Sequence, residues 1–71
     1  MLEKIIEILS QYTEEEITEE SILVNDLGLT SFDLVSLVTE FEDEFDVEIA
    51  DREIRKLVSV ADIMEYIENY Q

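Results

Sequence analysis

LGLTSFDLVSLVTEFEDEF, from Leu27 to Phe45, is the stretch that decides the fold of this chain. It contains the only glycine, Gly28, which permits a sharp turn through positive φ, followed by Thr30, a suitable helix N-cap. Asp33 stands three residues after Thr30 and completes a variant of the capping box, and its charge suits the positive end of a helix dipole. The pattern therefore predicts a helix from about Ser31 to Phe45.

This predicted helix carries apolar residues on two faces. At about 100° per residue, one stripe should face the core, and it consists of Leu34, Leu37, Val38, Phe41 and Phe45. Phe32 and Val35 lie outside the stripe, on the face expected to meet water. Four polar residues share that face: Ser36, Thr39, Glu42 and Asp43. Single exposed apolar side chains are ordinary, but two of them beside carboxylates at a helix start are typical of a transient docking site.

The rest of the chain also has helical periodicity, which predicts an all-α fold: a small antiparallel bundle of three main helices plus one short helix, with a long first loop. A first helix is expected over about Leu2–Tyr12, with the stripe Leu2, Ile5, Ile6, Leu9 and Tyr12. Residues 13–28 have no sustained helical stripe, but they carry enough apolar anchors to form a packed loop, which at this length is often functional.

Two further helices are expected after the central one. The short helix should cover Arg52–Leu57, capped by Asp51, with Ile54, Leu57 and Val58 facing inward. Ser59 and Asp62 repeat the capping pattern and predict a last helix. Its apolar stripe consists of Val60, Ile63, Met64, Ile67 and Tyr70.

Composition limits the possible functions. With 71 residues, the chain should form a single domain over residues 1–71, close to the size at which one hydrophobic core becomes marginal. It has no cysteine and no histidine, so thiol nucleophiles, imidazole catalysis and the usual zinc ligands are excluded, and neither an enzyme nor a metal site is expected. The N-terminal MLEKIIEILS lacks the pattern of a signal peptide, and no apolar run is long enough to span a bilayer, so we expect a cytoplasmic protein.

Charge indicates the kind of partner. Asp and Glu number 20 against 4 Lys and Arg, a net charge of −16 that repels nucleic acid and anionic membranes and attracts basic protein surfaces. High net charge also accompanies disorder, but 46% of the residues are hydrophobic, so the chain should fold. We expect a monomer that binds basic surfaces of other proteins, and neither nucleic acid nor a membrane.

Ser31 has an unusual position for a plain capping residue. Thr30 already supplies the cap, which leaves the Ser31 hydroxyl free at the first helical position. A phosphate esterified to that oxygen would lie near unpaired backbone N–H groups and the positive end of the helix dipole. The position therefore suits a phosphate-linked modification.

The run DLGLTSFDLVSLVTEFEDEF, Asp26 to Phe45, resembles the signature of acyl carrier proteins, in which an Asp-Ser-Leu triplet after a DLG turn bears a 4'-phosphopantetheine arm. The resemblance extends over essentially the whole chain in length, acidity and helix order. It implies that a phosphopantetheinyl transferase moves the arm from coenzyme A onto Ser31 with magnesium, and that the terminal thiol then holds acyl groups as thioesters. The chain would supply the attachment site and the surface that partners recognise, while partner enzymes supply catalysis.

The same resemblance implies where partners bind and where this sequence departs from its family. The family's partner-contact positions on this helix fall on Phe32, Val35, Ser36, Thr39, Glu42 and Asp43. Thr30 replaces the usual aspartate and Phe32 the usual leucine, while Ser36 and Thr39 stand where many carriers of fatty-acid synthesis have Glu and Met. On the short helix, where those carriers are typically acidic, stand Arg52, Arg55 and Lys56. The complete predicted docking surface is Thr30, Phe32, Asp33, Val35, Ser36, Thr39, Glu42, Asp43, Arg52 and Arg55.

Several functions remain open. A carrier for fatty acid biosynthesis is favoured, and the alternative is a specialised carrier, of an amino acid, D-alanine or a polyketide or nonribosomal peptide intermediate, loaded by an adenylating enzyme. An acidic inhibitor or nucleic-acid mimic would differ by having no modification on Ser31. A calcium sensor is rejected because DEFDVE lacks the glycine and ligand spacing of an EF-hand. A catalyst built from paired carboxylates is rejected because these acids line solvent faces.

Overall fold

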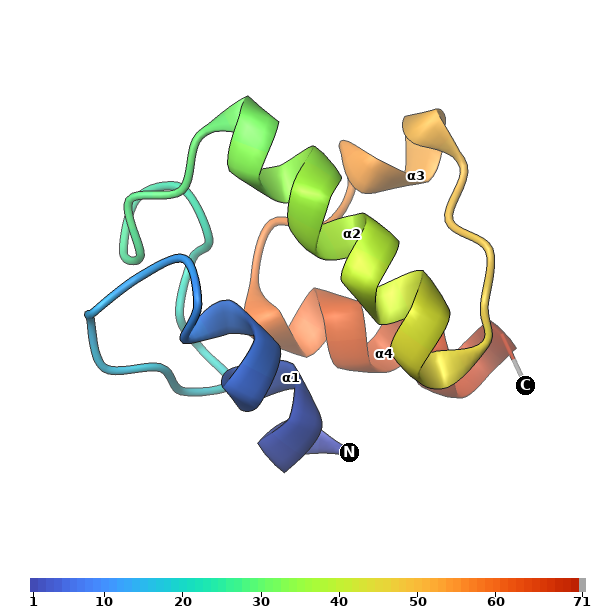
Figure 1. The fold of residues 1–71 in the computed structure, drawn as a ribbon, viewed down its shortest axis with the longest axis horizontal. Coiled ribbons are helices and arrows are strands. Elements are labelled where there is room, and N and C mark those ends of the chain that lie inside the picture. Colours follow the sequence, from blue (N-terminus) through green and yellow to red (C-terminus); the bar gives the residue numbers. More distant parts are fainter. Residues whose placement is uncertain (71) are drawn as a thin grey trace.

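The computed structural model describes residues 1–70 and contains, within that range, four helices: α1 (Leu2–Leu9), α2 (Ser31–Phe45), α3 (Asp51–Ile54) and α4 (Val60–Tyr70). Helix α2 crosses the middle of the molecule, and the long 10–30 loop lies to one side (Figure 1). Helix α2 contacts α1 and α3, and α1 also contacts α4. Residues 1–70 form no strand, although one isolated antiparallel bridge joins Ile22 to Ser59. The all-α prediction is confirmed.

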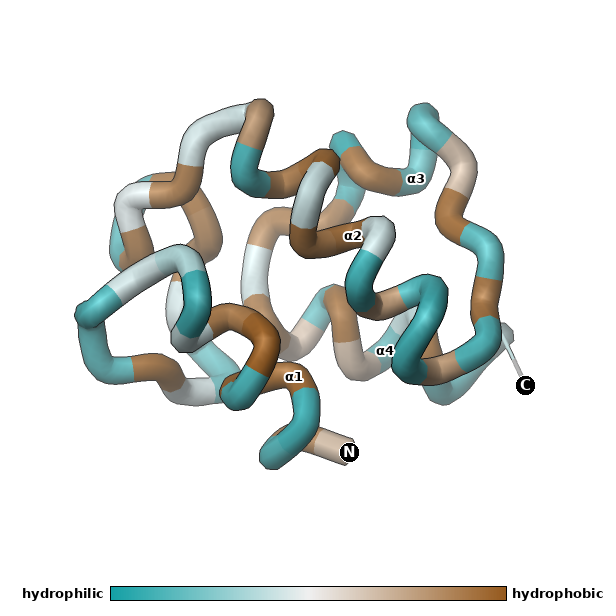
Figure 2. Tube along the Cα trace, viewed as in Figure 1, coloured by the Kyte–Doolittle hydropathy of each residue, from teal (hydrophilic) through white to brown (hydrophobic). Residues whose placement is uncertain are grey.

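The core is built from loops as well as helices. Ile5, Leu9, Phe41 and Ile67 are completely buried, and they come from α1, α2 and α4. The loops contribute Leu23, Leu27, Leu29, Val47 and Ile49, all buried. Hydrophobic segments accordingly recur along the loops as they do along the helices (Figure 2). The 10–30 loop is thus packed against the core as expected, which fixes the start of α2.

Helix α1 is shorter than predicted. It ends at Leu9 rather than Tyr12, because Gln11 and Tyr12 donate to carbonyls three residues back and so tighten the chain into turns. Tyr12 then points to α2, where its hydroxyl donates to the carboxylate of Glu40. Ile8, which the expected stripe omitted, is buried.

The short helix was predicted with the wrong bounds, over Arg52–Leu57. Helix α3 spans Asp51–Ile54, its N-cap is Ala50, and no side chain caps it. Leu57 is buried as expected, but Val58 is 52% exposed. The reason lies in its backbone: the Val58 carbonyl accepts from the N–H of Leu23 at 2.9 Å, beside the Ile22–Ser59 bridge, and this pairing leaves the side chain pointing outward.

Helix α4 has the predicted cap but a shorter buried stripe. The Asp62 N–H donates to Ser59 Oγ at 3.2 Å, and the Ser59 N–H donates to Asp62 Oδ2 at 3.0 Å, so the reciprocal capping pattern is confirmed. Tyr70 was expected in the core stripe, but it is 47% exposed. It lies at the end of the helix and pairs with Tyr66, with ring centroids 6.3 Å apart, instead of entering the core.

Candidate functional site

The turn before α2 is held by hydrogen bonds within residues 22–28. The Ile22 N–H donates to Asp26 Oδ2 at 2.8 Å, and the Gly28 N–H donates to the Val24 carbonyl at 3.1 Å. Gly28 has φ 71°, and a Cβ placed there would meet nothing within 4 Å. A glycine is therefore favoured here by the positive φ and not by a lack of space for a side chain. This turn buries Leu27 and Leu29 on either side of it and so delivers Thr30 to the helix start.

The start of α2 is closed by the predicted capping box. Thr30 has extended backbone angles, its Oγ1 accepts from the Asp33 N–H at 3.1 Å, and Asp33 Oδ2 accepts from the Thr30 N–H at 3.1 Å. Both side chains are thus committed to the helix terminus. Ser31 follows as the first helical residue without any capping duty.

Ser31 is free to carry a group. Its side chain is exposed, and its hydroxyl forms no hydrogen bond with any part of residues 1–70. The backbone N–H groups of Ser31 and Phe32 likewise have no acceptor within the same range. They stand at the positive end of a 15-residue helix, which is a favourable place for an anion. The residues present therefore fit a phosphodiester on the Ser31 oxygen.

An apolar groove of about 760 Å³ begins beside Ser31. Its walls include Val24 from the loop, Val35 from α2, Ile54 from α3, and Val58. The three valines are 53%, 57% and 52% exposed, and they lie together rather than scattered singly over the surface. Because they line one groove, their exposure indicates a surface prepared for an apolar group rather than for water alone.

The predicted docking face of α2 is largely open. Phe32 is 79% exposed and Val35 is 57% exposed, as the helical periodicity predicted. Thr39 and Asp43 are exposed, and Ser36 is half-buried. The face thus presents two apolar side chains with polar neighbours, and its docking role remains a prediction.

Glu42 has a structural contact that the sequence pattern did not indicate. It is half-buried, and its Oε2 accepts from the N–H of Ile49 at 2.8 Å, which holds the 46–50 segment against α2. Its backbone carbonyl also accepts from the N–H of Val47, directly after Asp46 with φ 54°. The partner of Glu42 lies seven residues away in a loop, so helical periodicity carried no signal for it.

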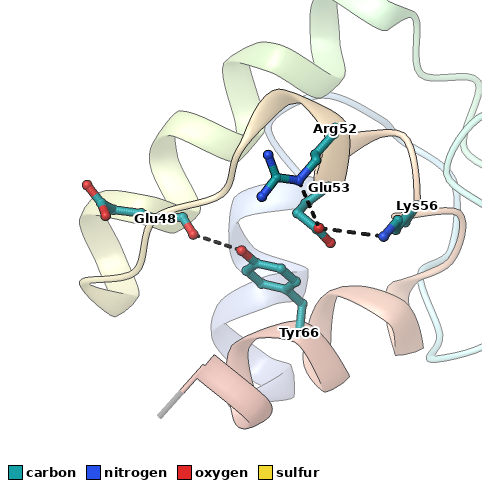
Figure 3. Close-up of polar contacts among 5 residues, drawn as sticks. All are labelled: Glu48, Arg52, Glu53, Lys56 and Tyr66. Atoms are coloured by element: carbon teal, nitrogen blue, oxygen red, sulfur yellow. Dashed lines mark hydrogen bonds and ion pairs between the residues drawn. The ribbon is translucent and has the colours of Figure 1, made fainter.

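The basic residues around α3 differ in their partners. Figure 3 shows Arg52 and Lys56 directed at Glu53: Arg52 Nε is 3.8 Å and Lys56 Nζ is 3.5 Å from Glu53 Oε1. Nearby, the hydroxyl of Tyr66 donates to the Glu48 carbonyl at 2.8 Å, and burial raises the pKa of this tyrosine. Arg55 instead lines the groove beside Ser31, so the two arginines face different surroundings.

Two kinds of site are not found in the part of the chain that the structure describes. Residues 1–70 contain no group of three or more Asp, Glu, His or Cys side chains arranged to hold a metal ion. No helix in this range has the length and hydrophobicity to cross a membrane.

The Ser31 hydroxyl thus stands free at a helix N-terminus with an apolar groove beside it. The family described as "Phosphopantetheine attachment site" matches residues 2–67. The chain is 44% identical over 70 residues to the acyl carrier protein of Buchnera aphidicola subsp. Baizongia pistaciae, covering 94% of this chain and 90% of that protein. It is 43% identical over 68 residues to the acyl carrier protein of Syntrophus aciditrophicus, covering 92% and 85%.

A solved structure agrees with these relatives. The acyl carrier protein from Enterococcus faecalis, described for its high thermal stability, superimposes with a TM-score of 0.86 at 30% identity, covering 99% of this chain and 92% of that one. The chain belongs to the acyl carrier protein family. Its prosthetic group is 4'-phosphopantetheine, and it is a carrier, not an enzyme.

Proposed function

We propose that Ser31 bears the 4'-phosphopantetheine arm and that the protein carries acyl groups as thioesters on it. The observation that carries this proposal is the Ser31 hydroxyl, exposed and without a hydrogen bond to residues 1–70, at the start of α2. When attached, the arm supplies the thiol that this chain, with no cysteine, lacks. The free first-turn N–H groups would stabilise the phosphodiester, and the adjacent groove would shelter an apolar cargo from water.

Intact mass spectrometry tests the attachment site. Coenzyme A, magnesium and a promiscuous phosphopantetheinyl transferase should add one arm of about 340 Da to the wild-type protein, the mass of this covalent cofactor. Ser31→Ala should abolish the addition. Ser36→Ala, the same change on the same helix at a half-buried position, should keep it. Modification of Ser31→Ala to the wild-type extent would contradict the proposal.

We propose that the exposed face of α2 docks partner enzymes through their basic surfaces. The support comes from the net charge of −16 and from the exposure of Phe32 and Val35. Acidic side chains would steer a basic surface, and the two apolar side chains would then be covered in the complex. Phe32→Ala should lower kcat/KM with the transferase by about five- to thirtyfold, the effect of a secondary interface anchor of about 1 to 2 kcal/mol.

The same docking face offers a matched control. Thr39→Ala truncates another exposed side chain of α2 and should change kcat/KM by less than about twofold. Equal losses in Phe32→Ala and Thr39→Ala would contradict a specific apolar anchor. Thr30→Asp keeps a good N-cap and adds a carboxylate before Ser31, so it should speed loading if the transferase places a basic residue there.

We propose fatty acid biosynthesis, in the cytoplasm, as the setting. The relatives named above are acyl carrier proteins, which supports an acyl cargo. The specialised carrier loaded by an adenylating enzyme stays as the second candidate because Arg52, Arg55 and Lys56 lie on and directly after α3, where carriers of fatty-acid synthesis are typically acidic. If the protein is a fatty-acid carrier, Arg52→Glu should leave turnover with ketoacyl synthases unchanged or improve it. If it is a specialised carrier, Arg52→Glu should impair charging by the adenylating partner, most strongly at low salt.

A further inference from the structure

Arg55 is the exception among the basic residues of this chain. Lys4 lies 4.0 Å from Glu44, and Arg52 and Lys56 both lie within 4.0 Å of Glu53. Arg55 has no carboxylate within 4.0 Å in residues 1–70, although the chain contains 20 acidic residues. A cation without a carboxylate partner in so acidic a protein keeps its hydrogen-bond donors free for another anion.

The position of Arg55 indicates where that anion would come from. Arg55 lines the same groove as Ser31, together with the apolar side chains of Val35 and Ile54 and with Asp51, whose carboxylate is not within 4.0 Å of the Arg55 guanidinium. We propose that Arg55 binds an oxyanion carried on the arm at Ser31, so that this groove holds an apolar segment and an anionic group at once; this rests on the proposed attachment to Ser31. The planar guanidinium suits a phosphate or a carboxylate through paired N–H donors.

Two groups on the arm share this chemistry. One is the phosphodiester that joins the arm to Ser31, which is present whatever the cargo. The other is a carboxylate at the far end of a cargo chain that folds back into the groove. Both present oxygen pairs with negative charge, and an experiment that varies the arm and the cargo separately distinguishes them.

The chain has only two arginines, which makes the measurement direct. The Nε–H signals of Arg52 and Arg55 would be recorded by NMR in the unmodified protein, in the arm-bearing protein, and in that protein loaded with pentanoyl or glutaryl thioester, two cargoes of equal carbon number. Arg55→Gln and Arg52→Gln assign the signals, and since both side chains are exposed, both variants should fold as the wild type does.

We expect the Arg55 signal to shift and its solvent exchange to slow, while the Arg52 signal stays unchanged. A change that appears with the arm and is equal for both cargoes identifies the phosphodiester, and a change that appears only with glutaryl identifies the cargo carboxylate. Either result supports the site. No change of the Arg55 signal in any loaded form overturns it.

Reactivity gives a second readout. In the form that shifts the Arg55 signal, attack of an external thiol on the thioester should be about two- to tenfold faster in Arg55→Gln than in wild type, the range of a partly exposed ion pair. Arg52→Gln removes the same charge three residues earlier in the chain and outside the groove, so its rate should match the wild type. Equal acceleration in both variants overturns the site. A protein that gains no mass with the transferase instead overturns the attachment to Ser31, which the mass spectrum shows before any NMR.

Discussion

Thr30→Ala should weaken the whole fold through one hydrogen bond. Thr30 Oγ1 accepts from the N–H of Asp33 at 3.1 Å, and alanine leaves that donor to water. Loss of an N-cap side chain costs about 0.5 to 2 kcal/mol. The box is exposed to solvent and the reciprocal bond from the Thr30 N–H to Asp33 can persist, so a value of about 1 kcal/mol is expected. For a domain of this size that corresponds to a loss of about 4 to 8 °C in Tm.

Thr39→Ala is the matched control, because it makes the same change on the same helix. Thr39 is exposed in the middle of α2, and its hydroxyl donates to the Val35 carbonyl at 3.2 Å. This carbonyl is also the acceptor of a backbone hydrogen bond within the helix, so the side-chain bond satisfies no free group of the helix terminus. Alanine has the higher helix propensity, so this variant should gain about 0.5 kcal/mol. The two substitutions should therefore have opposite signs.

Urea unfolding followed by circular dichroism measures both variants in the unmodified protein at one fixed salt concentration. Equal m-values would show that the difference in midpoint is a difference in stability. Thr30→Asp should lie within a few tenths of a kcal/mol of wild type, since aspartate caps as well as threonine. A Thr30→Ala protein as stable as wild type, or a Thr39→Ala protein destabilised to the same degree, would refute the assignment of Thr30 as the cap that stabilises α2.

Three further outcomes follow from the structure. Phe41→Ala should lower the free energy of unfolding by about 3 to 5 kcal/mol, because this side chain is completely buried. Phe32→Ala should change it by less than about 0.5 kcal/mol, because Phe32 is exposed. Equal effects of the two substitutions in urea unfolding would contradict the assignment of Phe41 and Phe32 to opposite faces of α2. Asp46→Gly should raise the free energy of unfolding by about 0.5 to 1 kcal/mol, because glycine adopts φ 54° without strain. Asp46→Asn removes the same charge and should raise it less, so an equal gain in both variants would show that charge rather than backbone strain is the cause. The hydrogen bond with Glu40 and burial raise the pKa of Tyr12 above its ordinary 10.0, so its contribution is complete below pH 10.0 and is lost as pH rises further. Tyr12→Phe should accordingly flatten part of the fall in Tm above about pH 10, and an unchanged fall would refute this.

The sequence by itself determined what local geometry controls. The bounds of α2, its Thr30–Asp33 box and the opposite exposures of Phe41 and Phe32 follow from helical period and from bonds over three residues, which operate before any tertiary contact forms. The Ser59–Asp62 box was predictable for the same reason. The free position of Ser31 followed from its neighbour, since one cap residue makes a second unnecessary.

The tertiary structure decided what depends on segments that are distant in sequence. Val58 points outward because its backbone pairs with Leu23, and no periodicity within residues 52–58 contains that information. Glu42 is half-buried because the 46–50 segment returns to α2 and offers it the N–H of Ile49. The groove beside Ser31 exists only where the 22–25 loop, α2 and α3 meet, and Arg55 lines it because the chain folds α3 across from the start of α2. Local bonds select the helices, whereas the packing of loops between them determines which charges are paired and which remain free.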